Sequence, residues 1–254
     1  MTAGSPRAAR SSEGAGVIVR QPKRLGILAP SSNTVLEPET ARLLPADGSV
    51  TSHVSRLRVV QISDDISSLQ QFEIEPVLIA AELLADAAVD LILWNGTAAS
   101  WLGFDRDRQW VAAIEARTGI RTTTAVMAIN EALQQLGTRR IGLVTPYVEA
   151  LEKRIIANYS GIGIDVTAAV RSDLTTNTDY AGITPDEIAE MVREVARSPV
   201  DAILILCTNL AGSSVAPALS RELGVPVLDS VRVAIEHSLT LLAGKPWKAA
   251  GSCG

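Results

Sequence analysis

Several residue types that commonly carry enzyme chemistry are scarce in this chain. Its 254 residues include two cysteines, two histidines and four lysines. The histidines, His53 and His237, are far apart and have no Cys or His at the spacing of zinc ligands, so we expect no metal site. None of the lysines lies where a strand is expected to meet a loop. A Schiff-base lysine, and with it pyridoxal phosphate, is therefore not expected.

Nucleotide-binding motifs and long apolar runs are also missing. No G-x-G-x-x-G opens a helix after a strand, and no G-x-x-x-x-G-K-[ST] occurs, so we expect no cofactor. No apolar run approaches the roughly 18–20 residues that span a bilayer, and the first residues lack the apolar region of a secretory signal. These absences predict a cytoplasmic protein without a membrane partner.

The charge balance and the ends of the chain narrow the possibilities further. The net charge is -5 and the pI is near 5.2, so there is no basic footprint for nucleic acid. Residues 1–23 are rich in Ser, Gly, Ala and Arg without periodicity, which predicts a disordered tail, with a transit peptide as the alternative. Two cysteines cannot make a disulfide framework, and Cys253 lies next to the C-terminus. Only Cys207 has an informative setting.

What the chain does contain is an internal repeat. Three segments of the first half are matched, in the same order, by three segments of the second half. The pairs are RLGILAP (24–30) with RIGLVTP (140–146), DLILWNG (90–96) with DAILILC (201–207), and TGIRTTTAVMAINEAL (118–133) with LGVPVLDSVRVAIEHSL (223–239). The short apolar runs predict buried parallel strands, and the third pair predicts a strand followed by an amphipathic helix.

Each half therefore reads as three strand–helix units, with an extra strand near 50–60 in the first half and near 163–170 in the second. This alternation predicts an α/β protein with two similar Rossmann-like lobes, each a parallel sheet covered by helices. We place the lobes at 24–138 and 139–248, with the terminal helix as a candidate to pack on the first lobe. Ligands bind outside the carboxyl ends of such strands, so a cleft between the lobes is the expected site.

The strand ends bring Cys207 to this cleft. It follows AILIL directly and precedes a helix expected to start around Ser213–Ser214, whose N-terminus would favour a thiolate and bind carboxylates. The alternative is a buried structural cysteine. The surrounding candidates are all neutral donors. They are the hydroxyls of Thr97, Tyr147 and Thr208 and the amides of Asn33 and Asn209. This set suits a small dicarboxylate whose developing enolate-like charge is held by neutral donors while a thiol moves one proton.

Structural roles compete with these assignments. Tyr147 could be an aromatic residue packing at a helix start, and Asn33 could cap the helix that follows it. Asn177 lies in a polar stretch for which a solvated turn is the default. Trp94 and Trp101 read as core or interface residues, His237 as a packing or surface residue, and His53 as a strand residue without special role.

These segments resemble the aspartate/glutamate racemase superfamily, in the branch that holds maleate cis–trans isomerases and arylmalonate decarboxylases. The isomerase pattern is carried by PSSNTVLEPE (30–39), RRIGLVTPYVEALEKRI (139–155), NT at 177–178 and VDAILILCTNL (200–210). GTAASWLG (96–103) and the following TGIRTTTAV are more similar to the decarboxylase. The resemblance covers nearly everything from Arg24 to Gly244.

The resemblance implies two lobes related by a pseudo-twofold axis, with the active site between them. Maleate isomerases and the racemases use one cysteine from each lobe, on opposite faces of the substrate carbon. In this chain the second-lobe cysteine corresponds to Cys207, but the first-lobe position is Gly96. The ligand positions implied are Asn33, Gly96, Thr97, Ala98, Tyr147, Asn177, Thr208 and Asn209. Where a family decarboxylase has Thr-Ser, this chain has Thr97-Ala98, so one hydroxyl is missing.

Three functions follow. A decarboxylase of a small (aryl)malonate-like dicarboxylate needs one proton donor and is our leading hypothesis, with Cys207 as that donor. A maleate isomerase or a racemase of the Asp/Glu/hydantoin type would need a replacement for the missing thiol, for which Asn95 and Thr97 are the candidates. The third is a protein that binds a carboxylate without catalysis. A homo-oligomer is possible in each case.

Overall fold

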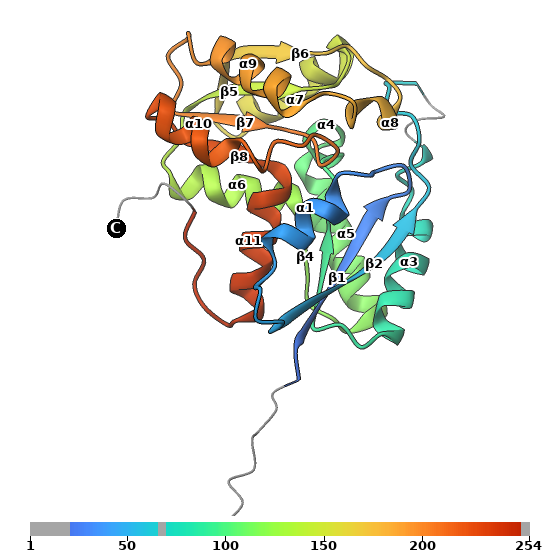
Figure 1. Ribbon diagram of the computed structural model, residues 1–254. Coiled ribbons are helices and arrows are strands. Elements are labelled where there is room, and N and C mark those ends of the chain that lie inside the picture. Colours follow the sequence, from blue (N-terminus) through green and yellow to red (C-terminus); the bar gives the residue numbers. More distant parts are fainter. Residues whose placement is uncertain (1–20, 66–69, 250–254) are drawn as a thin grey trace, which may run out of the picture.

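Two four-stranded parallel sheets form the centre of the molecule (Figure 1). The computed structural model describes residues 21–65 and 70–249. The first sheet contains β1 (Lys23–Pro30), β2 (Val50–Leu57), β3 (Leu91–Trp94) and β4 (Thr122–Thr124), in the order β2-β1-β3-β4. The second contains β5 (Arg140–Thr145), β6 (Asp165–Arg171), β7 (Ala202–Ile205) and β8 (Val227–Asp229), in the order β6-β5-β7-β8. The matching orders confirm the predicted α/β fold of two similar lobes.

Helices connect the strands in both halves. In the first half they are α1 (Leu36–Leu43), α3 (Ile74–Asp86), α4 (Ala99–Leu102), α5 (Phe104–Thr118) and α6 (Ala125–Gln135). In the second half they are α7 (Glu149–Gly161), α8 (Asn177–Tyr180), α9 (Pro185–Val195), α10 (Ala216–Leu223) and α11 (Ser230–Leu242). Within the described ranges, no helix is long and apolar enough to cross a membrane.

Local sequence explains where several of these elements begin and end. β3 and β7 are short apolar runs buried along their whole length, as expected for central strands of sheets covered on both faces. α9 starts with a capping box, in which Thr184 accepts a hydrogen bond from the backbone N–H of Glu187 and the Glu187 carboxylate accepts one in return. α5 ends at Gly119, whose φ of +70° suits a left-handed helix cap.

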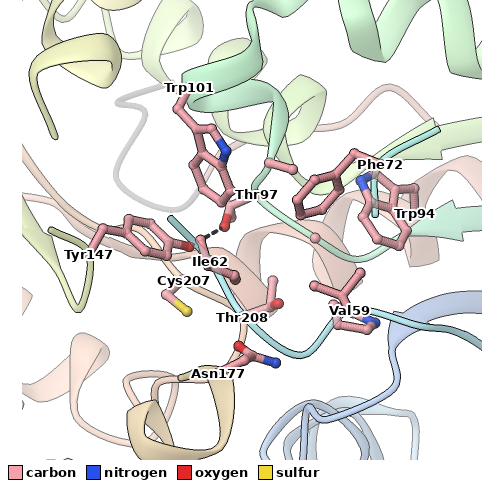
Figure 2. A pocket seen from close by; sticks show the side chains of 13 residues that line it. Val59, Ile62, Phe72, Trp94, Thr97, Trp101, Tyr147, Asn177, Cys207 and Thr208 are labelled. Carbon is pink, nitrogen blue, oxygen red and sulfur yellow. Dashed lines mark hydrogen bonds between the residues drawn. The ribbon is translucent and has the colours of Figure 1, made fainter. Parts of the chain in front are cut away.

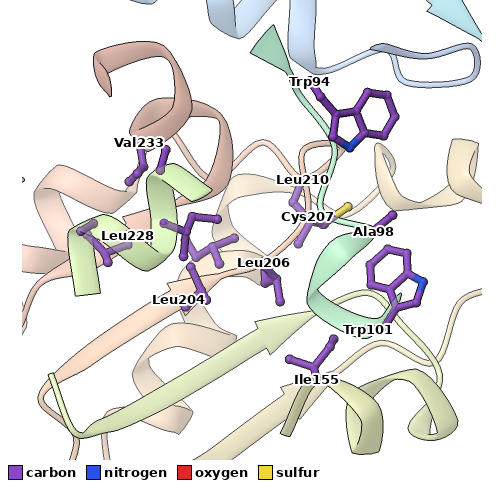
Figure 3. Close-up of a cluster of buried hydrophobic side chains, with 14 of the residues drawn as sticks. Trp94, Ala98, Trp101, Ile155, Leu204, Leu206, Cys207, Leu210, Leu228 and Val233 are labelled. Atoms are coloured by element: carbon purple, nitrogen blue, oxygen red, sulfur yellow. The ribbon is translucent and has the colours of Figure 1, made fainter. Parts of the chain in front are cut away.

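The last helix of the second half lies against the sheet of the first. One buried cluster combines Val231, Ala234 and Ile235 of α11 with Leu25, Ile27, Leu91 and Leu93 of β1 and β3. A second, larger cluster is continuous between the lobes. Figure 3 shows it running from Leu204 and Leu228 of the second lobe to Trp94 and Trp101 of the first. The two sheets are therefore held together by shared apolar packing.

Two of the boundaries expected from the sequence differ in the structure: the end of the N-terminal tail and the start of the helix after Cys207. The predicted tail extends to residue 23, but Lys23 already pairs with Val50 as the first residue of β1. The rest of that tail through residue 20 lies outside the described residues, as does Cys253. The helix expected around Ser213–Ser214 begins later, at Ala216, because Gly212–Val215 form turns before it.

Candidate active site

A pocket lies between the two sheets, where the carboxyl ends of their strands meet (Figure 2). It is lined by Pro30, Val59, Ile62, Phe72, Trp94, Gly96, Thr97, Ala98, Trp101, Tyr147, Asn177, Cys207 and Thr208. Both lobes contribute to this lining. Seven of the nine site residues expected from the sequence are among them.

Cys207 comes two residues after the end of β7, and its side chain is buried in the wall of the pocket. Its Sγ accepts a hydrogen bond from the backbone N–H of Asn209 at 3.3 Å. Burial raises the pKa of the thiol to about 11, although the Tyr147 hydroxyl and this N–H act in the opposite direction. The expectation that a helix N-terminus would favour a thiolate is therefore wrong. At neutral pH Cys207 is a protonated thiol.

The hydroxyls of Thr97 and Tyr147 form a pair across the two lobes. Their oxygens are 2.8 Å apart, in the same pocket wall as Cys207. Tyr147 is fully buried and its ring also packs against Trp101, with ring centroids 4.7 Å apart. Both sequence interpretations of Tyr147, packing aromatic and pocket residue, therefore apply. The pair presents hydroxyl groups to the pocket and carries no charge, because burial raises the pKa of Tyr147 well above its usual value.

Thr208 connects the pocket to the residues behind it. Its Oγ1 accepts a hydrogen bond from Nδ2 of Asn33 at 3.1 Å and donates one to the carbonyl of Asn95 at 3.2 Å. Asn33 does not line the pocket. Its Oδ1 accepts from the backbone N–H groups of Val35 and Leu36, so Asn33 caps the first turn of α1 while it binds the opposite lobe.

Asn209 has a similar position behind the pocket. Its Oδ1 accepts hydrogen bonds from the backbone N–H groups of Thr34 and Val35, and its Nδ2 donates to the carbonyl of Asn177. Each of these hydrogen bonds joins segments far apart in the sequence. Asn33 and Asn209 thus hold the pocket walls in place, whereas the other seven expected residues face the pocket itself.

Asn177 is buried at the start of α8, so the default interpretation as a solvated turn is wrong. Its backbone N–H donates to the carbonyl of Val60 at 3.0 Å, and its Nδ2 donates to Oγ of Ser32 at 2.8 Å. An isolated antiparallel bridge between Gln61 and Thr176 lies beside these contacts. The loops after β2 and β6 are therefore joined by main-chain hydrogen bonds, and this brings Asn177 to the pocket.

The sequence interpretation missed most of an apolar wall. It is formed by Val59, Ile62, Phe72, Trp94 and Trp101, and the rings of Phe72 and Trp101 meet edge to face at 6.3 Å. Trp94 and Trp101 are core residues, as expected, but they also line the pocket. Val59, Ile62 and Phe72 belong to the long connection between β2 and α3. A connection without regular periodicity offers no signal for which side chains turn inward.

The chemistry available in the pocket is narrow. Among the lining residues of the described chain there is no carboxylate, amine, guanidinium or imidazole, so Cys207 and the phenol of Tyr147 are the ionisable groups. Within the same described ranges, no group of three His, Cys, Asp or Glu side chains is placed to hold a metal ion. This arrangement can hold a carboxylate through hydroxyl groups and can donate a proton from sulfur.

Comparison with known proteins identifies the family. Residues 25–253, nearly the whole chain, match the sequence pattern of the family described as arylmalonate decarboxylase. The chain belongs to this family. As the sequence predicts, this member of the arylmalonate decarboxylase family carries its candidate site between two related lobes.

The relatives of this family member divide between two activities. The maleate isomerase of Geobacillus stearothermophilus is 24% identical over 220 residues, which cover 82% of this chain and 86% of the relative. The arylmalonate decarboxylase of Bordetella bronchiseptica is 25% identical over 223 residues, covering 87% and 90%. A solved structure of the Nocardia farcinica maleate cis–trans isomerase, a mutant with a covalently bound succinylcysteine intermediate, superposes with a TM-score of 0.81 at 23% identity, covering 89% and 94%. These relatives are enzymes, and both their names match the branch expected from the sequence.

Proposed function

We propose that this protein is a cofactor-independent decarboxylase of a small malonate that carries an apolar, arylmalonate-like substituent. One observation carries the proposal: the pocket is faced by the single protonated thiol of Cys207, and the residue that corresponds to Cys207 in the other lobe is Gly96. Racemisation needs a proton relay on each face of the substrate carbon. Decarboxylation needs one proton, and one thiol can deliver it.

The two walls of the pocket match the two parts of such a substrate. The hydroxyls of Thr97 and Tyr147 suit the oxygens of a carboxylate that stays on the product, because one of their two protons is free beside the hydrogen bond between them. The Thr208 hydroxyl can join them by turning its proton from the Asn95 carbonyl to the substrate. The apolar wall suits an aromatic or alkyl substituent, since Phe72 and Trp101 offer ring faces and edges for packing. Maleate has no apolar substituent to fill this second wall. The departing carboxylate would lie on the apolar side, where its charge is poorly solvated.

The reaction balances with the groups present. The bond between the α-carbon and one carboxylate breaks and carbon dioxide leaves, while the electron pair remains on the α-carbon and spreads into the retained carboxylate as an enediolate. Hydroxyl donors stabilise the charge that develops on those oxygens. The Cys207 S–H then gives its proton to the α-carbon. The thiolate that remains accepts a hydrogen bond from the Asn209 N–H and regains a proton from water.

The test is acid release from 2-methyl-2-phenylmalonate. We expect the wild-type protein to release carbon dioxide and Cys207→Ala to lose about 10²–10⁴-fold in kcat, the usual contribution of a general acid. Cys207→Ser keeps the size of the side chain and is the control for packing, and it should be nearly as slow because a hydroxyl is a much weaker acid. Turnover by Cys207→Ala at the wild-type rate contradicts the proposed role.

A maleate isomerase is the second candidate, and one observation favours it. The Nocardia farcinica relative was solved with a succinylcysteine intermediate in a mutant in which one cysteine is replaced by serine, so the adduct there is on another cysteine. This chain also has a thiol, Cys207, in a pocket of the same fold. Under this function maleate would be converted to fumarate, and intact-protein mass spectrometry would detect an adduct that Cys207→Ala cannot form. Saturable binding of either dicarboxylate without chemical change would instead support the non-catalytic alternative.

A further inference from the structure

The indole of Trp94 occupies the space beside Gly96, on the side of the pocket away from Cys207 (Figure 2). A Cβ atom added to Gly96 would lie 2.5 Å from Cζ2, 2.8 Å from Cε2 and 3.0 Å from Cη2 of this indole. Real Cβ atoms essentially never approach heavy atoms below 3.0 Å. Any side chain at residue 96 would therefore have to displace the six-membered ring of Trp94.

The ring of Trp94 is firmly held. Its side chain is fully buried, and Trp110 packs against it edge to face, with ring centroids 5.3 Å apart and an interplanar angle of 72°. A rigid bicyclic ring in a close-packed surrounding cannot move aside as the end of a flexible chain can. The space beside Gly96 is thus occupied by a buried ring that Trp110 supports.

The indole N–H adds a second observation. Nε1 of Trp94 is buried and has no hydrogen-bond partner. An unpaired buried donor is unfavourable for stability, and phenylalanine at this position would avoid the penalty. The size of the Trp94 ring, which reaches Gly96, therefore accounts for tryptophan at this position, and its N–H group does not.

We propose that Trp94 determines the stereochemistry of the reaction by closing the Gly96 side of the pocket to any second acid. This inference rests on the proposed decarboxylase function. With the indole in place, neither a side chain at residue 96 nor a water molecule reaches the substrate carbon from that side. The proton then comes from Cys207 alone, and the product forms as one enantiomer. Trp94 is accordingly a specificity-determining residue, while Cys207 remains the catalytic one.

The steric part is tested by thermal unfolding, which does not depend on activity. In the wild-type background we expect Gly96→Ala to lower Tm by about 5 °C, as overpacking of a core does. In a Trp94→Phe background, which removes part of the bicyclic ring, the same change should cost much less. Trp101→Phe is the matched control and should give no relief, because the atoms nearest to a Cβ at residue 96 all belong to Trp94. An equal loss in all three backgrounds overturns the inference.

The chemical part is tested by the handedness of 2-phenylpropanoate formed from 2-methyl-2-phenylmalonate. Wild type should give one enantiomer in large excess. Gly96→Cys combined with Trp94→Phe should give a large fraction of the other enantiomer, and Gly96→Cys alone should give far less or fail to fold. A product from the double variant as pure as that of wild type overturns the inference. Absence of turnover by wild type instead refutes the proposed function, and the unfolding comparison still decides whether Trp94 fills the space.

Discussion

Two opposing effects act on the pKa of the Cys207 thiol. Burial disfavours the thiolate and raises the pKa of the thiol to about 11, while the Asn209 N–H and the Tyr147 hydroxyl are placed to stabilise the negative sulfur once it forms. A group of this kind is a poor nucleophile in the resting enzyme. It is well suited to give up a proton to a strongly basic carbanion and then to recover it.

This balance predicts the pH dependence of the reaction. Under the proposed function the thiol acts in its protonated form. Because burial raises its pKa to about 11, kcat/KM should be level from about pH 7 to about pH 10 and should fall as the pH rises through about 11. The measurement is a pH–rate profile with 2-methyl-2-phenylmalonate, accompanied by alkylation of Cys207 with iodoacetamide, which should accelerate over the same upper range. A rate that climbs steadily above pH 7 would instead indicate a reactive thiolate, as an addition mechanism requires.

The residues differ in how far the sequence predicts them. Four of the site residues come two or three positions after the ends of buried strands: Thr97, Tyr147, Cys207 and Thr208. Because the carboxyl ends of parallel strands converge, their meeting in one pocket is predictable. Asn33 is brought close but turned away, because its short amide satisfies backbone N–H groups of its own segment first. The position of a ring within an irregular loop, and the pKa of a buried thiol, depend on tertiary packing that no local pattern encodes.

Among the elements, β4 and β8 end in the same way. Thr124 caps α6 by accepting from the N–H of Met127, and Asp229 caps α11 by accepting from the N–H of Arg232. In the first lobe Asp107 of α5 also binds the Thr124 hydroxyl. Burial raises the pKa of both carboxyl groups, Asp107 and Asp229, to about 7. At both caps, the packing of a helix is therefore linked to the protonation of a buried carboxyl group.

The carboxyl group of Asp107 predicts a pH-dependent stability. In the folded protein the pKa of Asp107 is about 7, above the ordinary 3.8. The free energy of unfolding that this carboxyl group contributes is therefore fully present below about pH 4 and is lost as the pH rises through about 7. Asp107→Asn cannot ionise, and should exceed wild type in unfolding free energy at pH 8 by on the order of 2–4 kcal/mol, with the gap closing towards pH 4.

Urea unfolding at about pH 8 and about pH 5 measures this difference. The matched control is Asp86→Asn, at the exposed end of α3, which should leave the comparison between the two pH values unchanged. A gap of the same size at both pH values would show that Asp107→Asn acts through packing and not through ionisation.

For the whole molecule, the repeated halves predicted two sheets of the same order, because each apolar run and its following helix recur in sequence. The placement of α11 over the first sheet does not follow from the repeat. Amphipathic periodicity indicates that a helix has a face to bury, but the sheet that covers this face is chosen by packing of the complete chain. The terminal helix was a candidate for this contact, whereas its partners Leu25, Ile27 and Leu91 are defined only by the folded structure.

Shared packing predicts that the two lobes unfold together. Three of the four tryptophans lie in the first lobe, and the fourth, Trp247, packs on His237 of α11. All three tyrosines, Tyr147, Tyr159 and Tyr180, lie in the second lobe. Tryptophan fluorescence and fluorine NMR of incorporated 3-fluorotyrosine should therefore report the lobes separately, and we expect their urea midpoints to coincide.

Ile235→Ala removes a buried contact of α11 with the first sheet and should shift both midpoints by the same amount, for a loss of about 2–5 kcal/mol. Separate midpoints, or a shift of one probe only, would show that each lobe is an independent folding unit.

The contact between α6 and α11 has a consequence for the breadth of the substrate range. These two helices pack extensively against each other, and both bury small side chains, Ala128 and Ala132 on α6 and Ala234 and Ser238 on α11. The spacing of packed helices follows the size of the residues between them. α6 belongs to the first half of the chain and α11 to the second, so their contact joins the two lobes. We expect larger residues in this contact, such as valine for alanine, to alter the width of the pocket from a distance. Under the proposed function, this would give protein engineers a way to admit bulkier substrates without altering the residues that perform the chemistry.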